Sequence, residues 1–148
     1  MASLIENKKA RLRFEVLETY AAGIELAGFE VKSVRARQGS LDGSRVIVRG
    51  GEAFIVGMTL PAYQLANAPK SYDPEKPRRL LLKRSEIAEL LDAETKKGLT
   101  VVPLELYNAG RYLKARVAVV RGKGKADRRE ELKRLEAKKE ADRAMRQK

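Results

Sequence analysis

Two hairpin patterns constrain the fold of this 148-residue chain more than any other feature. At residues 45–57 the runs RVIVR and EAFIVG flank Gly50-Gly51, and adjacent glycines allow the positive φ angles of a tight antiparallel turn. At residues 99–122 the runs LTVVPLELY and RYLKARVAVV, joined at Asn108-Ala109-Gly110, predict a second hairpin. Pro103 cannot donate a ladder hydrogen bond, so we expect an edge or a bulge there.

The segments around the hairpins predict further strands and a loop. EVKSVRAR at residues 30–37 fits either a short helix or a strand, and we expect a helix. Residues 61–77 hold four of the five prolines and predict a loop. RRLLL at residues 78–82 predicts a short strand or an extended approach to a helix. A strand is expected at FEVLETY, residues 14–20, with one face made by Phe14, Val16, Glu18 and Tyr20.

A helix is expected at residues 86–97, with Ser85 as its N-cap because the hydroxyl can accept from a free amide of the first turn. Its buried stripe is expected to contain Ile87, Leu90 and Leu91. Antiparallel hairpins in a chain too short for two packed sheets plus helices favour a small closed barrel over a sandwich. We therefore expect a mainly β fold, a closed antiparallel barrel of about six strands with two or three short helices.

The charge balance points to a polyanionic partner. The chain carries 32 Lys and Arg against 20 Asp and Glu, a net charge of +12 with a pI near 10.1. Nucleic acid or an anionic membrane surface would each match that charge. Because no apolar run is long enough to cross a membrane and no secretory leader is seen, we expect a cytosolic protein. Cys and His are absent, which removes thiolate sites, the commonest zinc ligand and the commonest general base.

The C-terminal segment GKGKADRREELKRLEAKKEADRAMRQK, residues 122–148, is expected to be a basic tail outside the domain at residues 1–121. Residues 121–148 hold 12 basic and 6 acidic residues, half of the net charge of the chain. The tail has too few large apolar side chains for a buried face, yet it consists mainly of strong helix formers. We expect it to be disordered when free and helical on a partner that offers phosphates. The alternative is a solvated terminus that only aids solubility.

Motifs along nearly the whole chain resemble the SsrA-binding protein family, also called small protein B. Each motif alone is weakly specific, but their shared order and spacing are highly specific. The motifs are NKKAR at 7–11, YAAGIELAGFEVKSV at 20–34, GEAFIVG at 51–57, DP at 73–74, RRLLL at 78–82, EI at 86–87, GLTVVPLELY at 98–107 and RGKGKADRRE at 121–130.

This resemblance implies an oligonucleotide-binding-like (OB-like) barrel without catalytic activity, cofactor or metal. It implies that the barrel binds the tRNA-like domain of transfer-messenger RNA and delivers it to the A site of stalled ribosomes for trans-translation. The tail would then occupy the empty mRNA channel near the decoding centre of the small subunit. We expect a cytoplasmic monomer, one copy per RNA, with no membrane partner.

The resemblance also implies the residues of both contact surfaces. The expected RNA-binding residues are Asn7, Lys8, Lys9, Arg11, Glu30, Lys32, Arg79, Leu81 and Lys83. The expected ribosome-binding residues of the tail are Lys123, Lys125, Asp127, Arg128, Arg129, Lys133 and Arg134.

Three of these assignments have a structural alternative. The segment around Asn7 is either an RNA contact, with the amide at a base edge, or a loosely held basic arm. Glu30 either accepts from base or sugar groups or forms an ion pair with Lys32 or another neighbour that orders the surface. Leu81 either faces outward between Arg79 and Lys83, where it packs against an unstacked nucleotide, or is a third core leucine.

The chain departs from the family pattern at four positions. Ala21 replaces a common Glu, Leu12 a His, Gly124 a Lys, and Ala126 an aromatic residue or His. An alanine methyl cannot stack on a base, so the last change removes a stacking group from the tail.

Two other functions fit the composition. A structural ribosomal protein or a general RNA-binding protein would also be a basic barrel with a basic extension. An RNA-modifying or RNA-cleaving enzyme is less well supported, because the sequence has no His, no Cys and no clustered acidic metal motif.

Overall fold

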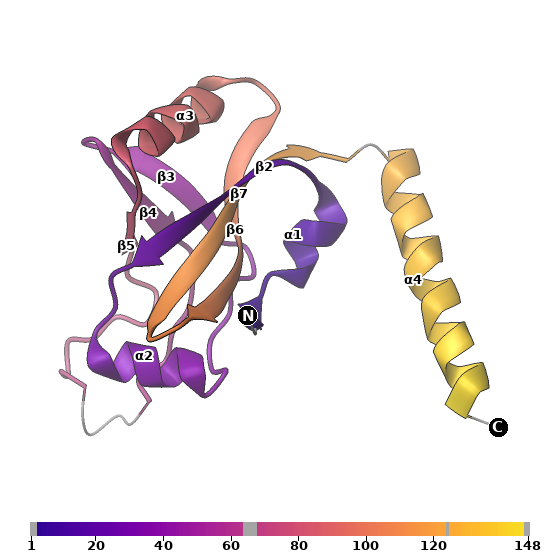
Figure 1. The fold of residues 1–148 in the computed structure, drawn as a ribbon, viewed down its shortest axis with the longest axis horizontal. Coiled ribbons are helices and arrows are strands. Elements are labelled where there is room, and N and C mark those ends of the chain that lie inside the picture. Colours follow the sequence, from indigo (N-terminus) through magenta and orange to yellow (C-terminus); the bar gives the residue numbers. More distant parts are fainter. Residues whose placement is uncertain (1–2, 64–67, 124, 147–148) are drawn as a thin grey trace.

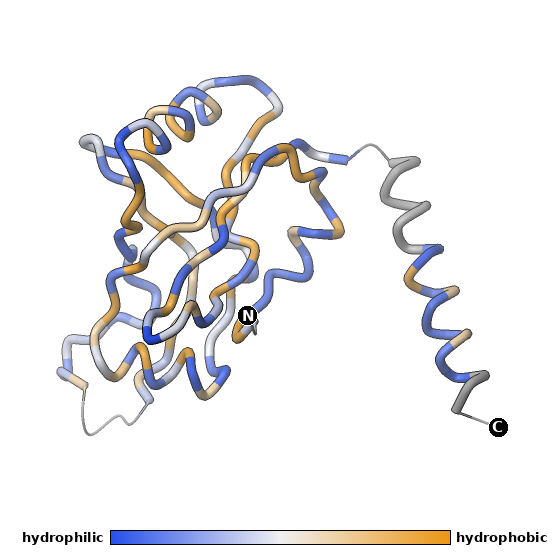
Figure 2. The backbone as a smooth tube through the Cα atoms, in the orientation of Figure 1, coloured by the Kyte–Doolittle hydropathy of each residue, from blue (hydrophilic) through white to orange (hydrophobic). Residues whose placement is uncertain are grey.

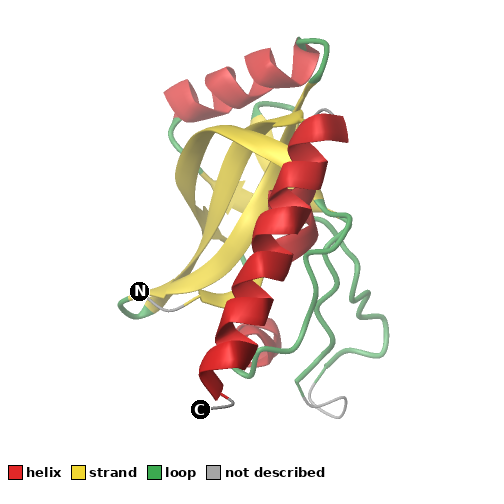
Figure 3. Cartoon of the chain, turned by 90° about the vertical axis from the view of Figure 1, so that its right-hand side faces the viewer, coloured by secondary structure: helices red, strands yellow, loops and turns green. Residues whose placement is uncertain are grey.

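The computed structural model describes residues 3–63, 68–123 and 125–146. One antiparallel sheet and four helices make up the described chain, and α2 and α3 lie at opposite ends of the curled sheet (Figures 1 and 3). In chain order the elements are β1 (Ser3–Glu6), α1 (Lys8–Arg13), β2 (Phe14–Ile24), α2 (Gly28–Arg35), β3 (Arg45–Arg49), β4 (Glu52–Val56), β5 (Arg78–Leu81), α3 (Arg84–Thr95), β6 (Leu99–Ala109), β7 (Tyr112–Gly122) and α4 (Lys125–Arg146).

The sheet has seven strands in the order β1-β6-β7-β2-β5-β4-β3, and every pairing is antiparallel. The mainly β class is confirmed, but the expected closed barrel is wrong. Among the described residues no ladder joins the edge strands β1 and β3. The edge amide of Val48 on β3 instead donates to Glu94 Oε1 of α3 at 3.4 Å, so a helix side chain takes the place of a closing strand.

Both predicted hairpins are confirmed. Gly50 and Gly51 adopt φ angles of 61° and 77° between β3 and β4. The second turn falls later than expected, at Gly110-Arg111, because Ala109 still pairs with Tyr112. The register of β6 shifts between Pro103 and Glu105, which confirms a bulge at the proline.

The strand predicted at residues 14–20 is present within β2, but its expected single face is wrong. The register against β7 shifts between Val16 and Glu18, so one extra residue is inserted there. An inserted residue turns the following side chains to the other face. Phe14 accordingly packs in a small cluster under α1, whereas Tyr20 belongs to the main core.

The helices agree with prediction in place but not in every detail. α2 confirms the helix expected at residues 30–37. α3 begins at Arg84, and its first turn is capped by Glu86, whose Oε1 accepts from the Lys83 amide at 3.0 Å, so the Ser85 cap is wrong. Leu90 is fully buried while Leu91 is 46% exposed, so Leu91 does not belong to the buried stripe.

Figure 2 shows how hydropathy follows this architecture, with apolar residues concentrated in the strands and mainly polar residues along the described part of α4. The main core lies inside the curl of the sheet, and a second cluster of Ala10, Val102, Leu104, Ala118 and Val120 lies under α1. No helix in the described part of the chain is long and apolar enough to cross a membrane.

Candidate nucleic-acid interface

Strand β5 presents one leucine to solvent between two cations. Leu80 is 2% exposed and Leu81 is 49% exposed, with Arg79 and Lys83 exposed on either side of Leu81. The expected outward orientation of Leu81 is thereby confirmed, and its contact with RNA stays a prediction. Gly23 pairs with Leu81 in the sheet, and a Cβ at Gly23 would lie only 3.1 Å from the Leu81 Cβ. The absence of a side chain at Gly23 therefore lets Leu81 lie flat against β2.

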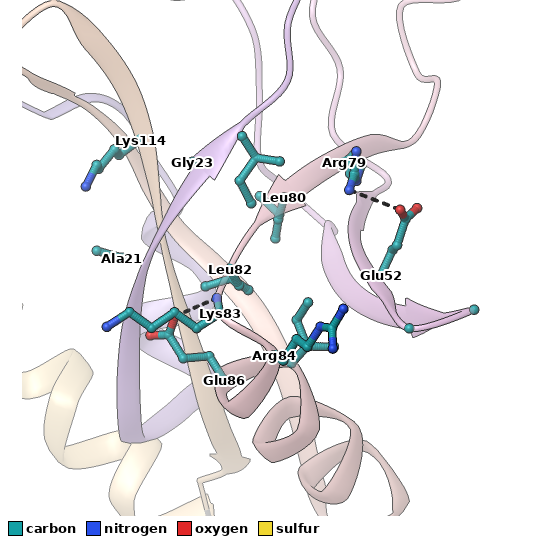
Figure 4. Close-up of a pocket in the computed structure, with 14 residues that line it drawn as sticks. Ala21, Gly23, Glu52, Arg79, Leu80, Leu82, Lys83, Arg84, Glu86 and Lys114 are labelled. Carbon is teal, nitrogen blue, oxygen red and sulfur yellow. Dashed lines mark hydrogen bonds and ion pairs between the residues drawn. The ribbon is translucent and has the colours of Figure 1, made fainter.

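Leu81 lines a groove of about 680 Å³ on the outer face of the sheet. Ala21 and Gly23 contribute small residues from β2, and Lys114 lines the groove from β7. In the view of Figure 4, Ala21 lies between Lys114 and Lys83, whereas Arg79 and Glu52 lie on the opposite side. The wall of the groove thus combines apolar surface with cations from β5, β7 and the start of α3.

The charged groups of the groove leave an excess of positive charge. Arg79 binds Glu25 at 3.2 Å and Glu52 at 3.0 Å, so its guanidinium is neutralised locally. By contrast, no ion pair is found in the described part of the chain for the remaining cations of the groove, which are Lys83, Arg84 and Lys114. Unpaired cations beside exposed apolar surface suit phosphates next to unstacked bases.

Glu30 is not on the surface. Its side chain is 1% exposed, and Oε2 accepts from Arg78 Nη2 at 2.8 Å and from Nε at 3.0 Å. Its Oε1 accepts from the Ala27 amide at 2.9 Å, and the Lys76 ammonium lies 3.6 Å away. The expected exposed carboxylate is therefore wrong, and the ion-pair alternative describes its environment, with Arg78 and Lys76 as partners instead of Lys32.

This network extends into the loop that precedes β5. The Tyr72 hydroxyl donates to the Leu60 carbonyl at 2.6 Å and lies 3.1 Å from Glu30 Oε2, while its ring packs edge-on against Phe29. Arg78, 1% exposed, also donates to the Met58 carbonyl at 3.1 Å. Glu30 on α2 thus binds the loop and Arg78, the first residue of β5. The strand β5 also carries Arg79 and Leu81.

The electrostatics of this cluster favour an ionised Glu30. Burial alone raises the pKa of its carboxyl, but the Ala27 amide and the Arg78 guanidinium outweigh burial and hold the pKa below its ordinary value of 4.5. The neutral phenol of Tyr72 is favoured, because burial and the nearby Glu30 charge raise its pKa. Tyr20 behaves similarly, since burial and its bond to Glu89, 2.7 Å long, raise its pKa.

Asn7 is also a buried, structural residue. It is 2% exposed and caps α1 by accepting from the Ala10 amide at 3.2 Å, while its Nδ2 donates to the Pro103 carbonyl at 2.9 Å. Both hydrogen-bonding groups of the amide are occupied by backbone. Asn7 therefore orients α1 in the structure instead of presenting an amide to a base edge.

α1 places its cations on the same outer face as the groove. Its Ala10 covers Ala118 and Val120 of β7, and alternation along β7 puts Lys114 and Arg116 on that same face. Glu105 joins the two regions, because it binds Arg116 at 3.1 Å and Arg11 at 3.6 Å. Lys8, Lys9 and Lys32 are exposed, and Lys9 lies 3.8 Å from Asp42.

The tail residues are placed only in part. The Lys123 amide donates to the Arg13 carbonyl at 3.0 Å, which fastens the end of β7 to α1. Lys133 and Arg134 are exposed on α4. Gly124 lies outside the described residues, as do the side chains of Lys125, Ala126, Asp127, Arg128 and Arg129.

Several residues of this region were missed by the sequence analysis. Arg84 and Lys114 line the groove, and Arg78 with Tyr72 holds Glu30. The alternation of RYLKAR places Lys114 opposite the core residues of β7 and was the available signal for it. Arg78 and Tyr72 had no comparable signal, because their partner lies 48 and 42 residues away in the chain.

The fold and the groove define a class: a small antiparallel β protein with cations and an exposed leucine on one outer face, and a helical basic tail. The family model of the SmpB protein matches residues 4–147. The chain is 42% identical over 143 residues to the SsrA-binding protein of Gloeobacter violaceus, covering 97% of this chain and 93% of that one. It is 40% identical over 137 residues to the SsrA-binding protein of Thermosipho africanus, covering 92% and 91%.

One similar solved structure is described as "tmRNA-SmpB: a journey to the center of the bacterial ribosome". The match has a TM-score of 0.69 and 39% identity, and covers 84% of this chain and 87% of the other. The chain therefore belongs to the SmpB family.

Proposed function

We propose that the chain binds transfer-messenger RNA (SsrA RNA) through its tRNA-like domain and delivers it to the A site of stalled ribosomes for trans-translation. The observation that carries this proposal is the nearly full-length similarity to SsrA-binding proteins, together with the match to a tmRNA–SmpB structure. The chain acts by binding, without catalysis. Because its partner is the ribosome, it works in the cytoplasm.

The domain at residues 1–121 holds the RNA in this proposal, and its curled, OB-like sheet offers the outer face. The contact residues are Leu81, Lys83 and Arg79 in the groove, Lys8, Lys9 and Arg11 on α1, and Lys32 on α2. Asn7 and Glu30 act by positioning those residues, since both are buried and bound by other groups. The tail at residues 122–148, disordered when free, is helical in the mRNA channel, and its cations bind ribosomal phosphates.

A gel-shift titration tests this function. At one stated salt concentration, the protein should bind the tRNA-like domain of transfer-messenger RNA far more tightly than an RNA duplex of equal length. Leu81→Ala should weaken that binding about tenfold, because an apolar contact with an unstacked base is lost. The matched control is Leu91→Ala, which removes a leucine that is 46% exposed on α3, outside the groove lining. Equal affinity of the wild type for both RNAs would refute the proposed function.

A further inference from the structure

The most exposed of the large hydrophobic side chains in the described chain is an aromatic ring at a hairpin tip. Tyr112 is 74% exposed at the start of β7. Within the part of the chain that the structure describes, its ring takes part in no aromatic pair or cation–π contact, and its hydroxyl in no hydrogen bond. The ring is therefore free to contact another molecule on its open face.

The tip that carries this ring is held in place. Gly110 takes a φ of 65° in the tight turn, and Tyr112 is paired in the ladder with Ala109. Arg35 of α2 reaches across and donates from Nη2 to the Arg111 carbonyl at 2.9 Å. Tyr112 is thus presented on a braced hairpin, so little conformational entropy is lost when its ring is contacted.

Tyr112 lies on the same outer face as the groove. Leu113 and Ala115 are buried in the main core, so their neighbours Tyr112 and Lys114 share the opposite face, about 7 Å apart along the strand. Lys114 pairs with Gly23, which in turn pairs with Leu81. A row across three strands therefore leads from Leu81 to Lys114, and Tyr112 continues it along β7.

We propose that Tyr112 and Lys114 extend the RNA-binding surface. An unpaired base stacks on the Tyr112 ring, and the Lys114 ammonium pairs with a phosphate beside it. This inference rests on the proposed function and adds two contact residues to it. The exposed Tyr112 ring lies next to Lys114, a cation that has no ion-pair partner in the described chain, and proteins bind single-stranded nucleic acid through this combination of ring and cation.

Two variants test whether the Tyr112 ring stacks on a base. If it does, Tyr112→Ala should weaken binding of the tRNA-like RNA about tenfold, whereas Tyr112→Phe, which keeps the ring, should bind like the wild type. The matched control is Tyr63→Ala, since Tyr63 is another exposed tyrosine, 42% exposed, outside the groove and the hairpin. Lys114→Gln should weaken binding and lower the slope of log affinity against log salt by about 1.

A second measurement keeps the inference testable if Tyr112→Ala unfolds. In a series of RNAs, the fluorescent base 2-aminopurine replaces one unpaired loop base at a time. At one of these positions, both wild type and Tyr112→Phe should quench its fluorescence. The inference is overturned if folded Tyr112→Ala binds the RNA as tightly as wild type does, or if Tyr112→Phe loses affinity. It is also overturned if wild type quenches 2-aminopurine at none of the tested positions. The proposed function fails separately, if the wild type does not prefer the tRNA-like RNA over the duplex.

Discussion

Glu30 illustrates why a charged side chain next to a binding surface need not touch the ligand. Four groups bind its carboxylate, and its exposed fraction of 1% leaves no oxygen for an RNA donor. Taking two charges out of water is costly, and a buried pair is stable only when both partners remain. We therefore expect Glu30 to matter for RNA binding only indirectly. It holds Arg78, and Arg78 in turn positions Arg79 and Leu81 on the same strand.

A double-mutant cycle tests this role. Glu30→Leu and Arg78→Met should each lower the free energy of unfolding by about 3 kcal/mol or more, because each leaves a buried charge without its main partner. The double variant should recover most of that loss, since an apolar pair of similar volume replaces the ion pair. Urea denaturation measures all three variants. The wild-type contribution is present above pH 4.5 and is lost as the pH falls through the lowered pKa of Glu30.

RNA affinity provides the decisive readout of the same cycle. If Glu30 only positions β5, the folded double variant should bind the tRNA-like RNA within about threefold of wild type, a difference of less than 1 kcal/mol. A stable double variant that has lost RNA binding would show instead that the carboxylate itself contacts RNA.

Helix α3 braces the exposed edge of the sheet. Leu90 and Ala93 bury its inner side, and Glu94 binds both the Val48 amide and Arg49 on β3. An edge strand with free amides is a template for pairing with other chains, and charged side chains are one way to protect it. We therefore expect Glu94 to contribute both to the stability of the folded chain and to its resistance to association.

Glu94→Ala should lower the free energy of unfolding by about 1 kcal/mol, because a partly buried amide and Arg49 lose their acceptor. It should also increase light scattering at high protein concentration, since the β3 edge becomes available. Asp92→Ala is the matched control on the same helix: its pair with Lys96 is exposed and contributes about 0.5 kcal/mol or less. Equal effects of the two substitutions would show that Glu94 does not protect the edge.

The net charge of +12 is divided evenly between residues 1–120 and residues 121–148. Cations of the outer face line the groove and lie on α1, whereas most of those of the tail belong to the helix α4, which leaves the sheet beyond α1 (Figure 1). This separation fits the two tasks of the proposed function: the outer face of the sheet binds transfer-messenger RNA, and the tail binds ribosomal RNA along the mRNA channel.

Deletion of residues 126–148 should leave the unfolding midpoint and the affinity for the tRNA-like RNA nearly unchanged, because the groove keeps all its residues. It should abolish peptide tagging on stalled ribosomes, measured in a reconstituted translation reaction. Leu81→Ala is the reciprocal variant, which should lose RNA affinity while the tail stays intact. Parallel loss of RNA binding and tagging on deletion would contradict the division of tasks.

Features that depend on neighbouring residues were predictable from the sequence, and features that depend on distant partners were not. The Gly50-Gly51 turn and the outward Leu81 follow from local backbone freedom and strand alternation. The extra residue before Glu18 depends on how β2 meets β7, and the burial of Asn7 depends on the Pro103 carbonyl, 96 residues away. The family resemblance therefore identified the motif at residues 7–11, but the expected exposure of the Asn7 amide to RNA is wrong.

The bond between the Lys123 amide and the Arg13 carbonyl gives the tail a fixed origin. From that origin α4 extends over 22 residues, about 33 Å at 1.5 Å per residue. In the proposed function, the number of residues in α4 thus sets how far the distal cations lie from the RNA-binding domain. Each added helical residue moves those cations about 1.5 Å along the helix axis and turns them about 100° around it.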